Sequence, residues 1–296
     1  MIKMELKNLT KSYEKGKIAL DHFSAAFEPG VYGLLGPNGA GKSTLIKSIT
    51  GAYSYDSGSI IFIDETGTQF KIHNPSDAKA AGIAAAYQDL LAAPELTVGE
   101  NFFLGRIPKT SLGAVDWSYI YQYSSKILRE YGISVDPRKK MRQLTVSQQM
   151  MVTIAKLSSE HAKLIIFDEP TALLPNQEVQ TFYKILRKLR ANGVSMIYVS
   201  HRLEEILEVC DRVTVLKDGA IVGTKETSSV TEGMLISMMV GRSMSDIYQI
   251  NKGVPGAEVL RVEHLTRKNS CSASTVSLRK GEVHGFFGMI GSGRTE

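Results

Sequence analysis

The chain has 296 residues, of which 43% are hydrophobic, which is enough for a full core and about two domains of about 150 residues each. Its net charge of +5 comes from dispersed basic residues, so the sequence predicts no nucleic-acid partner. The two cysteines, Cys210 and Cys271, lie far apart, which argues against a zinc site or a disulfide framework and fits a reduced, cytoplasmic compartment. There is neither a signal-peptide pattern nor an apolar stretch long enough for a membrane span, so any membrane role must go through a partner.

Strands dominate the beginning of the chain. Residues 2–9 alternate between apolar and polar, and residues 19–27 and 59–63 are further strand candidates. Residues 31–35 are short and apolar, as a buried parallel strand should be, whereas residues 43–49 carry helical spacing. The loop between that strand and that helix is the most informative stretch of the sequence.

This loop fits the pattern G-x-x-x-x-G-K-[ST] and is predicted to hold phosphate groups. Its glycines permit positive φ angles and let backbone N–H groups approach a polyphosphate, beside the positive end of the following helix. Lys42 can reach the β- and γ-phosphates, and the Ser43 hydroxyl can ligate Mg²⁺. The residues assigned to nucleotide binding are Gly36, Pro37, Asn38, Gly39, Ala40, Gly41, Lys42, Ser43 and Thr44. The loop predicts an ATP or GTP site.

Helices and strands alternate in the rest of the first 242 residues. A mostly helical insertion is expected over about residues 90–157, with helices at residues 98–106 and 118–131, and an amphipathic helix at residues 177–190. Three apolar runs have strand character: residues 164–167, 195–199 and 212–216. This alternation predicts an α/β fold with a parallel sheet wrapped by helices.

Two adjacent carboxylates follow one of these strands. Asp168 and Glu169 come directly after residues 164–167, and ligands of parallel sheets gather at the carboxyl edge. Asp168 can hold Mg²⁺, and Glu169 can orient and deprotonate a water in line with the γ-phosphate. The pair therefore predicts hydrolysis of the bound nucleotide.

An internal repeat indicates a second domain of the same kind. Residues 5–11 recur as residues 261–267, and residues 30–36 recur as residues 281–288. A relic of the phosphate loop follows, with Gly288, Gly291, Gly293, Arg294, Thr295 and Glu296. Arg294 replaces the lysine, so this second loop is degenerate. We expect a first domain over residues 1–242, a linker at residues 243–257, and the truncated start of a second domain at residues 258–296.

Five motifs in order resemble the ATPase of an ATP-binding-cassette (ABC) transporter. They are the phosphate loop, Gln88 after a strand, Leu144–Gln149, Asp168–Thr171 and Ser200–Arg202. Several segments are similar to the tandem-cassette ATPases of bacterial monosaccharide importers: residues 95–101, 103–106, 200–206 and 239–242. The resemblance covers about residues 2–242. It implies a P-loop NTPase core, an antiparallel N-terminal β subdomain and a helical ABC insertion.

The resemblance also assigns roles to residues. Tyr13 would stack on adenine, Gln88 would sense the γ-phosphate and Mg²⁺, and His201 would hydrogen-bond the γ-phosphate. The signature segment that completes the site of an opposite cassette would be Leu144, Thr145, Val146, Ser147 and Gln148. In this family the helical insertion contacts the permease, here with about residues 92–103 closest to it.

Two positions depart from the family pattern. Ser147 replaces a glycine of the signature, so its Cβ is expected to crowd the γ-phosphate of the opposite cassette, and Pro175 stands where many cassettes carry aspartate. Together with Arg294, the change at Ser147 suggests one composite site that binds nucleotide but turns over poorly.

The resemblance implies a Mg²⁺-dependent ATPase that powers monosaccharide import from the cytoplasmic face of the membrane. Its partners would be membrane permease subunits, a periplasmic or lipid-anchored sugar-binding protein, and a second cassette. Two alternatives remain open: a tandem ABC protein that is not a transporter, and a fragment that binds nucleotide without hydrolysing it. The sequence does not identify the sugar.

Overall fold

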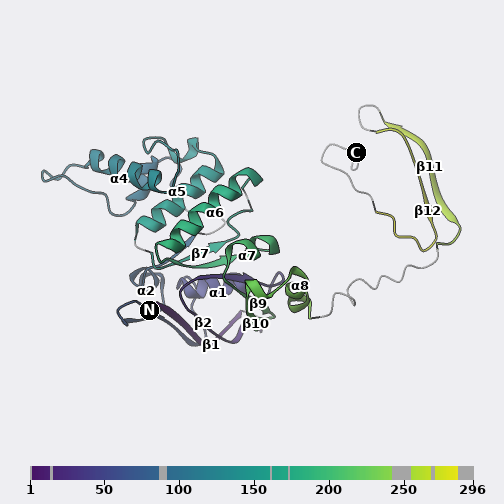
Figure 1. Cartoon of the computed structure of the whole chain (residues 1–296), viewed down its shortest axis with the longest axis horizontal. Coiled ribbons are helices and arrows are strands. Elements are labelled where there is room, and N and C mark those ends of the chain that lie inside the picture. Colours follow the sequence, from purple (N-terminus) through teal and green to yellow (C-terminus); the bar gives the residue numbers. More distant parts are fainter. Residues whose placement is uncertain are drawn as a thin grey trace. The chain divides into compact units, whose positions relative to one another are not determined.

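The computed structural model describes residues 2–13, 16–86, 92–160, 162–172, 174–241, 255–267 and 271–285. By its internal contacts the chain divides into two compact units, Met1–Gly241 and Arg242–Glu296 (Figure 1). Each unit is described by itself. The assignment of these units as a first cassette, a linker and a truncated second cassette stays a prediction.

A six-stranded sheet forms the centre of the first unit, and its strands follow the order β10-β9-β3-β8-β7-β6. The strands are β3 (Val31–Leu35), β6 (Ile83–Ala86), β7 (Leu164–Asp168), β8 (Ser195–Val199), β9 (Arg212–Lys217) and β10 (Ala220–Glu226). All neighbours are parallel except β9 and β10, which form an antiparallel pair. The predicted parallel sheet is confirmed, and the carboxyl ends of β3, β7 and β8 meet at one edge.

Helices cover both faces of this sheet, which explains why its central strands are apolar throughout (Figure 1). In β7, Ile165 and Phe167 pack into one hydrophobic cluster, whereas Leu164 and Ile166 pack into another. The first cluster includes α6 (Asn176–Ala191) and the second includes α1 (Lys42–Ile49). The remaining helices of this core are α2 (Pro75–Ala80), α7 (Leu203–Val209), α8 (Glu232–Val240) and the 3₁₀ turn η2 (Thr227–Ser229). Across the described ranges, no helix combines the length and apolar character needed to cross a bilayer.

A second, antiparallel sheet packs on the α1 side of the core. Its order is β2-β1-β4-β5, with β1 (Lys3–Tyr13), β2 (Lys17–Phe27), β4 (Ser57–Ile63) and β5 (Gln69–Lys71). Its inward residues, among them Leu6, Phe23 and Phe62, are almost fully buried in the cluster that also holds α1. The expected antiparallel β subdomain is therefore present, with β1 and β2 longer than the alternation predicted.

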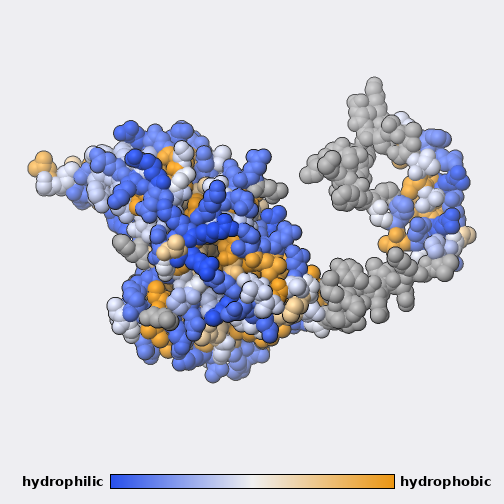
Figure 2. Space-filling model, in the orientation of Figure 1, coloured by the Kyte–Doolittle hydropathy of each residue, from blue (hydrophilic) through white to orange (hydrophobic). Residues whose placement is uncertain are grey.

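The helical insertion lies between β6 and β7. It contains α3 (Val98–Phe102), α4 (Trp117–Glu130), η1 (Met141–Gln143) and α5 (Val146–Ser159). A helix was predicted over residues 98–106, but α3 ends at Phe102. Gly105 then takes a φ of 80°, which a helix does not allow. The loop between α3 and α4 projects from the insertion (Figure 2), and Leu112 within it is 94% exposed.

The second unit contains a hairpin that repeats a detail of the first. Strands β11 (Glu258–Arg267) and β12 (Cys271–Arg279) are antiparallel, and their register shifts between Val262 and Leu265. The β1–β2 pair shifts at the corresponding residues, between Leu6 and Leu9. Asn8 and His264 both take positive φ at this bulge, 48° and 52°, and both backbone N–H groups donate to a hydroxyl on the partner strand. This shared bulge supports the internal repeat. The degenerate loop of residues 288–296 lies outside the described residues.

Candidate functional site

The phosphate loop, residues 36–44, connects β3 to α1 and leaves no space for side chains at two of its glycines. A Cβ on Gly36 would lie 2.4 Å from the Leu216 carbonyl oxygen of β9. A Cβ on Gly41 would lie 2.3 Å from the Ala19 carbonyl oxygen of β2, and Gly41 also has a φ of 100°. Glycine is therefore required at both positions, because the neighbouring strands press directly on the loop.

Lys42 lies at the start of α1 and turns its side chain back over the loop. Its Nζ donates to the Gly36 carbonyl at 2.5 Å and to the Pro37 carbonyl at 3.1 Å. Burial lowers the pKa of Lys42, and the carboxylates of Glu169 and Asp168 oppose this shift. The cation is thus held inside the concave face of the loop, where a polyphosphate could replace the two carbonyl contacts.

Two carboxylates and a histidine meet at the same edge of the sheet. Asp168 ends β7, and Glu169 follows it with a φ of 49°, a strained conformation fixed by a hydrogen bond from its N–H to the Val199 carbonyl of β8 at 2.9 Å. The His201 Nδ1 lies 3.3 Å from Glu169 Oε1. Adjacent parallel strands therefore bring together groups that are separated by about thirty residues in the sequence.

A cavity of about 250 Å³ lies between the phosphate loop and the two carboxylates, and His201 is not among the residues that line it. It is lined by Tyr13, Lys17, Ala19, Asn38, Gly39, Ala40, Gly41, Lys42, Ser43, Thr44, Asp168, Glu169 and Val199. Most of these are residues that the sequence singles out. Lys17, Ala19 and Val199 were missed, because no local pattern shows that β2 and the end of β8 lie beside the loop.

Tyr13 lies at the rim of this cavity. The residue is 41% exposed, its hydroxyl is 3.0 Å from Thr44 Oγ1, and Tyr53 lies edge-on with the ring centroids 6.4 Å apart. This leaves a partly exposed aromatic surface beside the phosphate loop. A planar base could stack there, so the geometry is compatible with the predicted adenine contact.

The structure also supplies hard oxygen donors beside the loop. Ser43 contributes a hydroxyl and Asp168 a carboxylate, and both line the cavity. Mg²⁺ prefers oxygen ligands of this kind and usually keeps several waters, so two protein donors fit it. Gln88, the third predicted ligand, lies outside the described residues.

The signature segment does not line this cavity. Thr145 caps α5, and its hydroxyl and the Gln148 side chain form a reciprocal capping box. Leu144 is buried, Val146 is 42% exposed, and Ser147 is 3% exposed. The Ser147 side chain therefore packs inward within this chain. The expected crowding of the γ-phosphate of an opposite cassette by its Cβ stays a prediction. Val146 carries the exposed side chain at the start of the helix.

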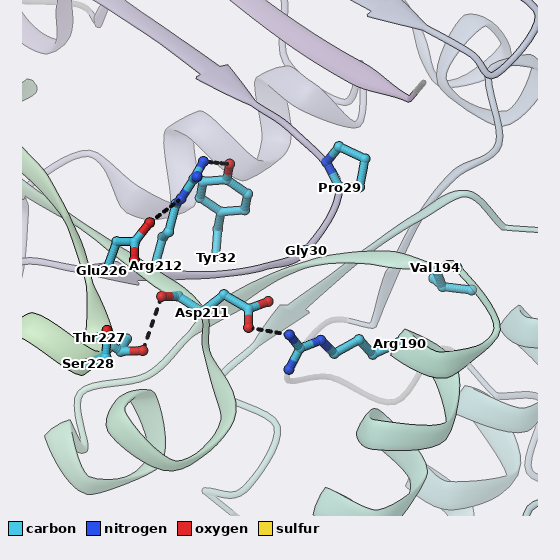
Figure 3. Close-up of a pocket in the computed structure, with 11 residues that line it drawn as sticks. Pro29, Gly30, Tyr32, Arg190, Val194, Asp211, Arg212, Glu226, Thr227 and Ser228 are labelled. Carbon is cyan, nitrogen blue, oxygen red and sulfur yellow. Dashed lines mark hydrogen bonds and ion pairs between the residues drawn. The ribbon is translucent and has the colours of Figure 1, made fainter.

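A larger cavity, of about 520 Å³, lies at the amino ends of β3, β8 and β9 (Figure 3). Its charged side chains are paired: Arg190 with Asp211 at 2.6 Å, and Arg212 with Glu226 at 3.6 Å. The Tyr32 hydroxyl also accepts a hydrogen bond from Arg212. The arginines are thus already neutralised, so this cavity is a poor anion site despite its size.

Asp168 should limit the stability of the protein at neutral pH. Burial, and then the Glu169 carboxylate, raise the pKa of Asp168 above its usual 3.8, while Lys42 opposes the shift. A raised folded-state pKa means that stability falls as the pH rises from about 4 through that pKa. We expect Asp168→Asn to raise the melting temperature at pH 7, by about 2 to 4 °C for each kcal/mol relieved. Thermal unfolding without nucleotide checks this. The gain should shrink toward pH 4, and no gain at pH 7 would contradict it.

Comparison with known proteins agrees with this site. The sequence profile of the ABC transporter family matches residues 20–172, just over half of the chain. The chain is 41% identical over 294 residues to the ribose import ATP-binding protein RbsA of Caldanaerobacter subterraneus. It is 40% identical over 296 residues to the galactose/methyl galactoside import ATP-binding protein MglA of Treponema denticola. These matches cover 99% of this chain but only 58% and 59% of the relatives.

A solved structure shares the fold of the first unit. The ADP conformation of MJ1267, an ATP-binding cassette of an ABC transporter, aligns with a TM-score of 0.69 at 25% sequence identity. The alignment covers 82% of this chain and all of that cassette. The profile match spans the phosphate loop and both carboxylates, and the chain belongs to the ABC transporter family.

Proposed function

We propose that the chain binds MgATP in the cavity beside residues 36–44 and takes part in its hydrolysis. The observation that carries this proposal is the convergence of Lys42, Asp168, Glu169 and Tyr13 on one cavity. Lys42 would balance the charge of the β- and γ-phosphates, and Asp168 and Ser43 would hold Mg²⁺. When bound, the metal would neutralise charge that develops on the phosphate oxygens.

Glu169 and His201 would act at the γ-phosphate end of the nucleotide. The Glu169 carboxylate would orient a water and accept its proton. His201, at 3.3 Å from that carboxylate, would donate a hydrogen bond to the γ-phosphate. Gln88 would complete the set from the segment before the helical insertion.

We further propose that this ATPase drives monosaccharide import. Support comes from the ribose, galactose and xylose import ATP-binding proteins that are about 40% identical to nearly the whole chain. The chain spans about 58% of the length of these relatives. The proposal therefore includes a second cassette, which would begin with the internal repeat and supply the opposite signature segment. Membrane permease subunits, fed by a sugar-binding protein, would bind the ATPase at the cytoplasmic face of the membrane.

Exposed apolar residues on the helical insertion support a permease contact there. Within the predicted range, Val98, Phe102 and Phe103 are buried, so they stabilise the insertion and are not available to a partner. Five exposed large apolar residues come just after it: Leu104, Ile107, Leu112, Trp117 and Tyr119. We therefore propose that the permease surface extends beyond Phe103 into this loop.

Sugar uptake into vesicles tests the import role. We expect a permease and the chain, joined to its second cassette, to take up labelled ribose, galactose or xylose only when ATP is supplied on the cytoplasmic side. The same assembly with Leu104→Arg should bind ATP normally but lose uptake. ATP binding without uptake of any of these sugars would contradict the import role and leave the nucleotide site intact.

Tyr13 is expected to contribute through its ring and not through its hydroxyl. Stacking of a base on an aromatic side chain is worth about 1–3 kcal/mol, so Tyr13→Ala should weaken ATP binding by about tenfold or more. Tyr13→Phe keeps the ring, loses only the contact to Thr44, and should bind within about threefold of the unchanged chain. Titration with a fluorescent ATP analogue measures both. Equal losses in the two variants would contradict stacking.

A further inference from the structure

Glu205 is a buried carboxylate that the proposed reaction does not use. It lies in α7 and is only 4% exposed, where an unpaired charge would be strongly destabilising. Its Oε1 accepts a hydrogen bond from Thr171 Oγ1 at 2.6 Å and one from Arg202 Nη1 at 3.1 Å. Arg202 therefore balances the charge, and Thr171 ties α7 to the loop that follows Glu169.

The second oxygen of this carboxylate fixes the segment around His201. Glu205 Oε2 accepts hydrogen bonds from the Tyr198 hydroxyl at 3.0 Å and from Ser200 Oγ at 2.9 Å. Ser200 Oγ also accepts a hydrogen bond from the Arg202 backbone N–H at 3.0 Å. His201 thus lies between two residues that are both bonded to Glu205, which restricts its backbone.

Both oxygens of the buried Glu205 carboxylate have hydrogen-bond donors. Four donors from two segments, residue 171 and residues 198–202, share its two oxygens, and the donor hydroxyls of Thr171 and Ser200 belong to buried residues. Burial, and then Glu205 itself, raise the pKa of Tyr198 above that of a free tyrosine, so its phenol remains a donor. Hydrogen bonds to a charged group in such surroundings are the strong ones.

We propose that Glu205 is a positioning residue that holds the loop of Glu169 and the loop of His201 at a fixed separation. The direct contact between these two side chains does not do so alone, because His201 is 64% and Glu169 30% exposed, and exposed ion pairs contribute little. The buried network through Thr171 and Glu205 supplies the rigidity. The proposal rests on the proposed function, in which His201 contacts the γ-phosphate.

Glu205→Gln is the direct test, because it keeps the shape but removes the charge. The NH₂ group of the new glutamine would face groups that now donate hydrogen bonds to the Glu205 carboxylate, and Arg202 would lose its counter-charge. We expect the affinity for AMP-PNP, which has a γ-phosphate, to fall by about tenfold, the loss of one hydrogen bond to a charged group. The affinity for ADP should change by less than about twofold, because the phosphate loop is untouched. Isothermal titration of the 296-residue chain with each nucleotide measures both.

Glu208→Gln is the matched control. Glu208 lies on the same helix with a 50% exposed side chain and pairs with Arg187 at the surface. The Glu208→Gln variant should leave the affinities for AMP-PNP and ADP unchanged. An unchanged ratio of the AMP-PNP and ADP affinities in Glu205→Gln would overturn the positioning role, whether both affinities fall equally or neither falls.

Backbone hydrogen exchange separates this proposal from the proposed function. Glu205→Gln should speed exchange at least about tenfold in both the 169–172 and the 200–204 segments. If the unaltered chain binds neither nucleotide, the proposed function fails, and exchange alone decides: loss of protection in only one segment, or in neither, overturns the role of Glu205. If Glu205→Gln does not fold, Thr171→Val decides, since it keeps the carboxylate and its pairing with Arg202. It should loosen residues 169–172, and unchanged exchange there would overturn the proposal.

Discussion

Replacing Lys42 with alanine is expected to reduce ATP binding at least about 100-fold. The side chain reaches into the concave face of the phosphate loop, where its Nζ now contacts the Gly36 and Pro37 carbonyl oxygens. Phosphate oxygens would replace these contacts, and a hydrogen bond to a charged group is worth about 1.5–3 kcal/mol. Two such bonds together correspond to a factor of about 100 or more. Equilibrium titration with labelled ATP measures the loss.

The control for this variant removes the same charge elsewhere. Lys79 is exposed on α2 and does not line the nucleotide cavity, so Lys79→Ala should bind ATP within about twofold of the unchanged chain. ATP binding within tenfold of the unchanged chain would place the nucleotide somewhere other than residues 36–44.

Glu169→Gln is expected to lower ATP hydrolysis by about 10² to 10⁴-fold, the usual contribution of a general base. The amide keeps the shape of the carboxylate beside His201, whose Nδ1 is now 3.3 Å from Glu169 Oε1, but it cannot take a proton from water. ATP affinity should remain within about threefold, because the carboxylate is not part of the phosphate loop. Single-turnover hydrolysis by the chain joined to its second cassette, with a parallel binding titration, measures both effects.

Two outcomes would count against Glu169 as the base. Hydrolysis within tenfold of the unchanged protein would assign proton transfer to another group. A parallel loss of binding and hydrolysis would instead show that the carboxylate holds the nucleotide. Glu204→Gln is the matched control, because Glu204 is exposed on α7 and lines no part of the nucleotide cavity.

Much of the site could be predicted from local sequence because its chemistry depends on consecutive residues. The spacing of Gly36, Gly41 and Lys42 already identifies the phosphate loop. The structure adds the reason for the two glycines, because backbone atoms of neighbouring strands leave no space for a Cβ there. Asp168 and Glu169 were predicted from one apolar strand, since a parallel sheet gathers its carboxyl ends at one edge. These features were visible because each depends on a single strand and the turn after it.

The features that the sequence did not show depend on packing between distant segments. Ser147 is buried within this chain at the start of α5, although nothing in the local pattern shows which way its side chain points. Lys17 and Ala19 line the cavity only because β2 crosses the loop.

The sequence by itself therefore determined which chemical groups this protein carries, the alternation of its strands and helices, and the internal repeat of residues 5–11 at residues 261–267. The tertiary structure alone decided which side chains face the cavity and which are buried, and it alone brought Glu205 into contact with Thr171, 34 residues away in the chain. The physical reason is that motifs record backbone conformation over a few residues, whereas burial and long-range hydrogen bonds depend on how whole elements pack.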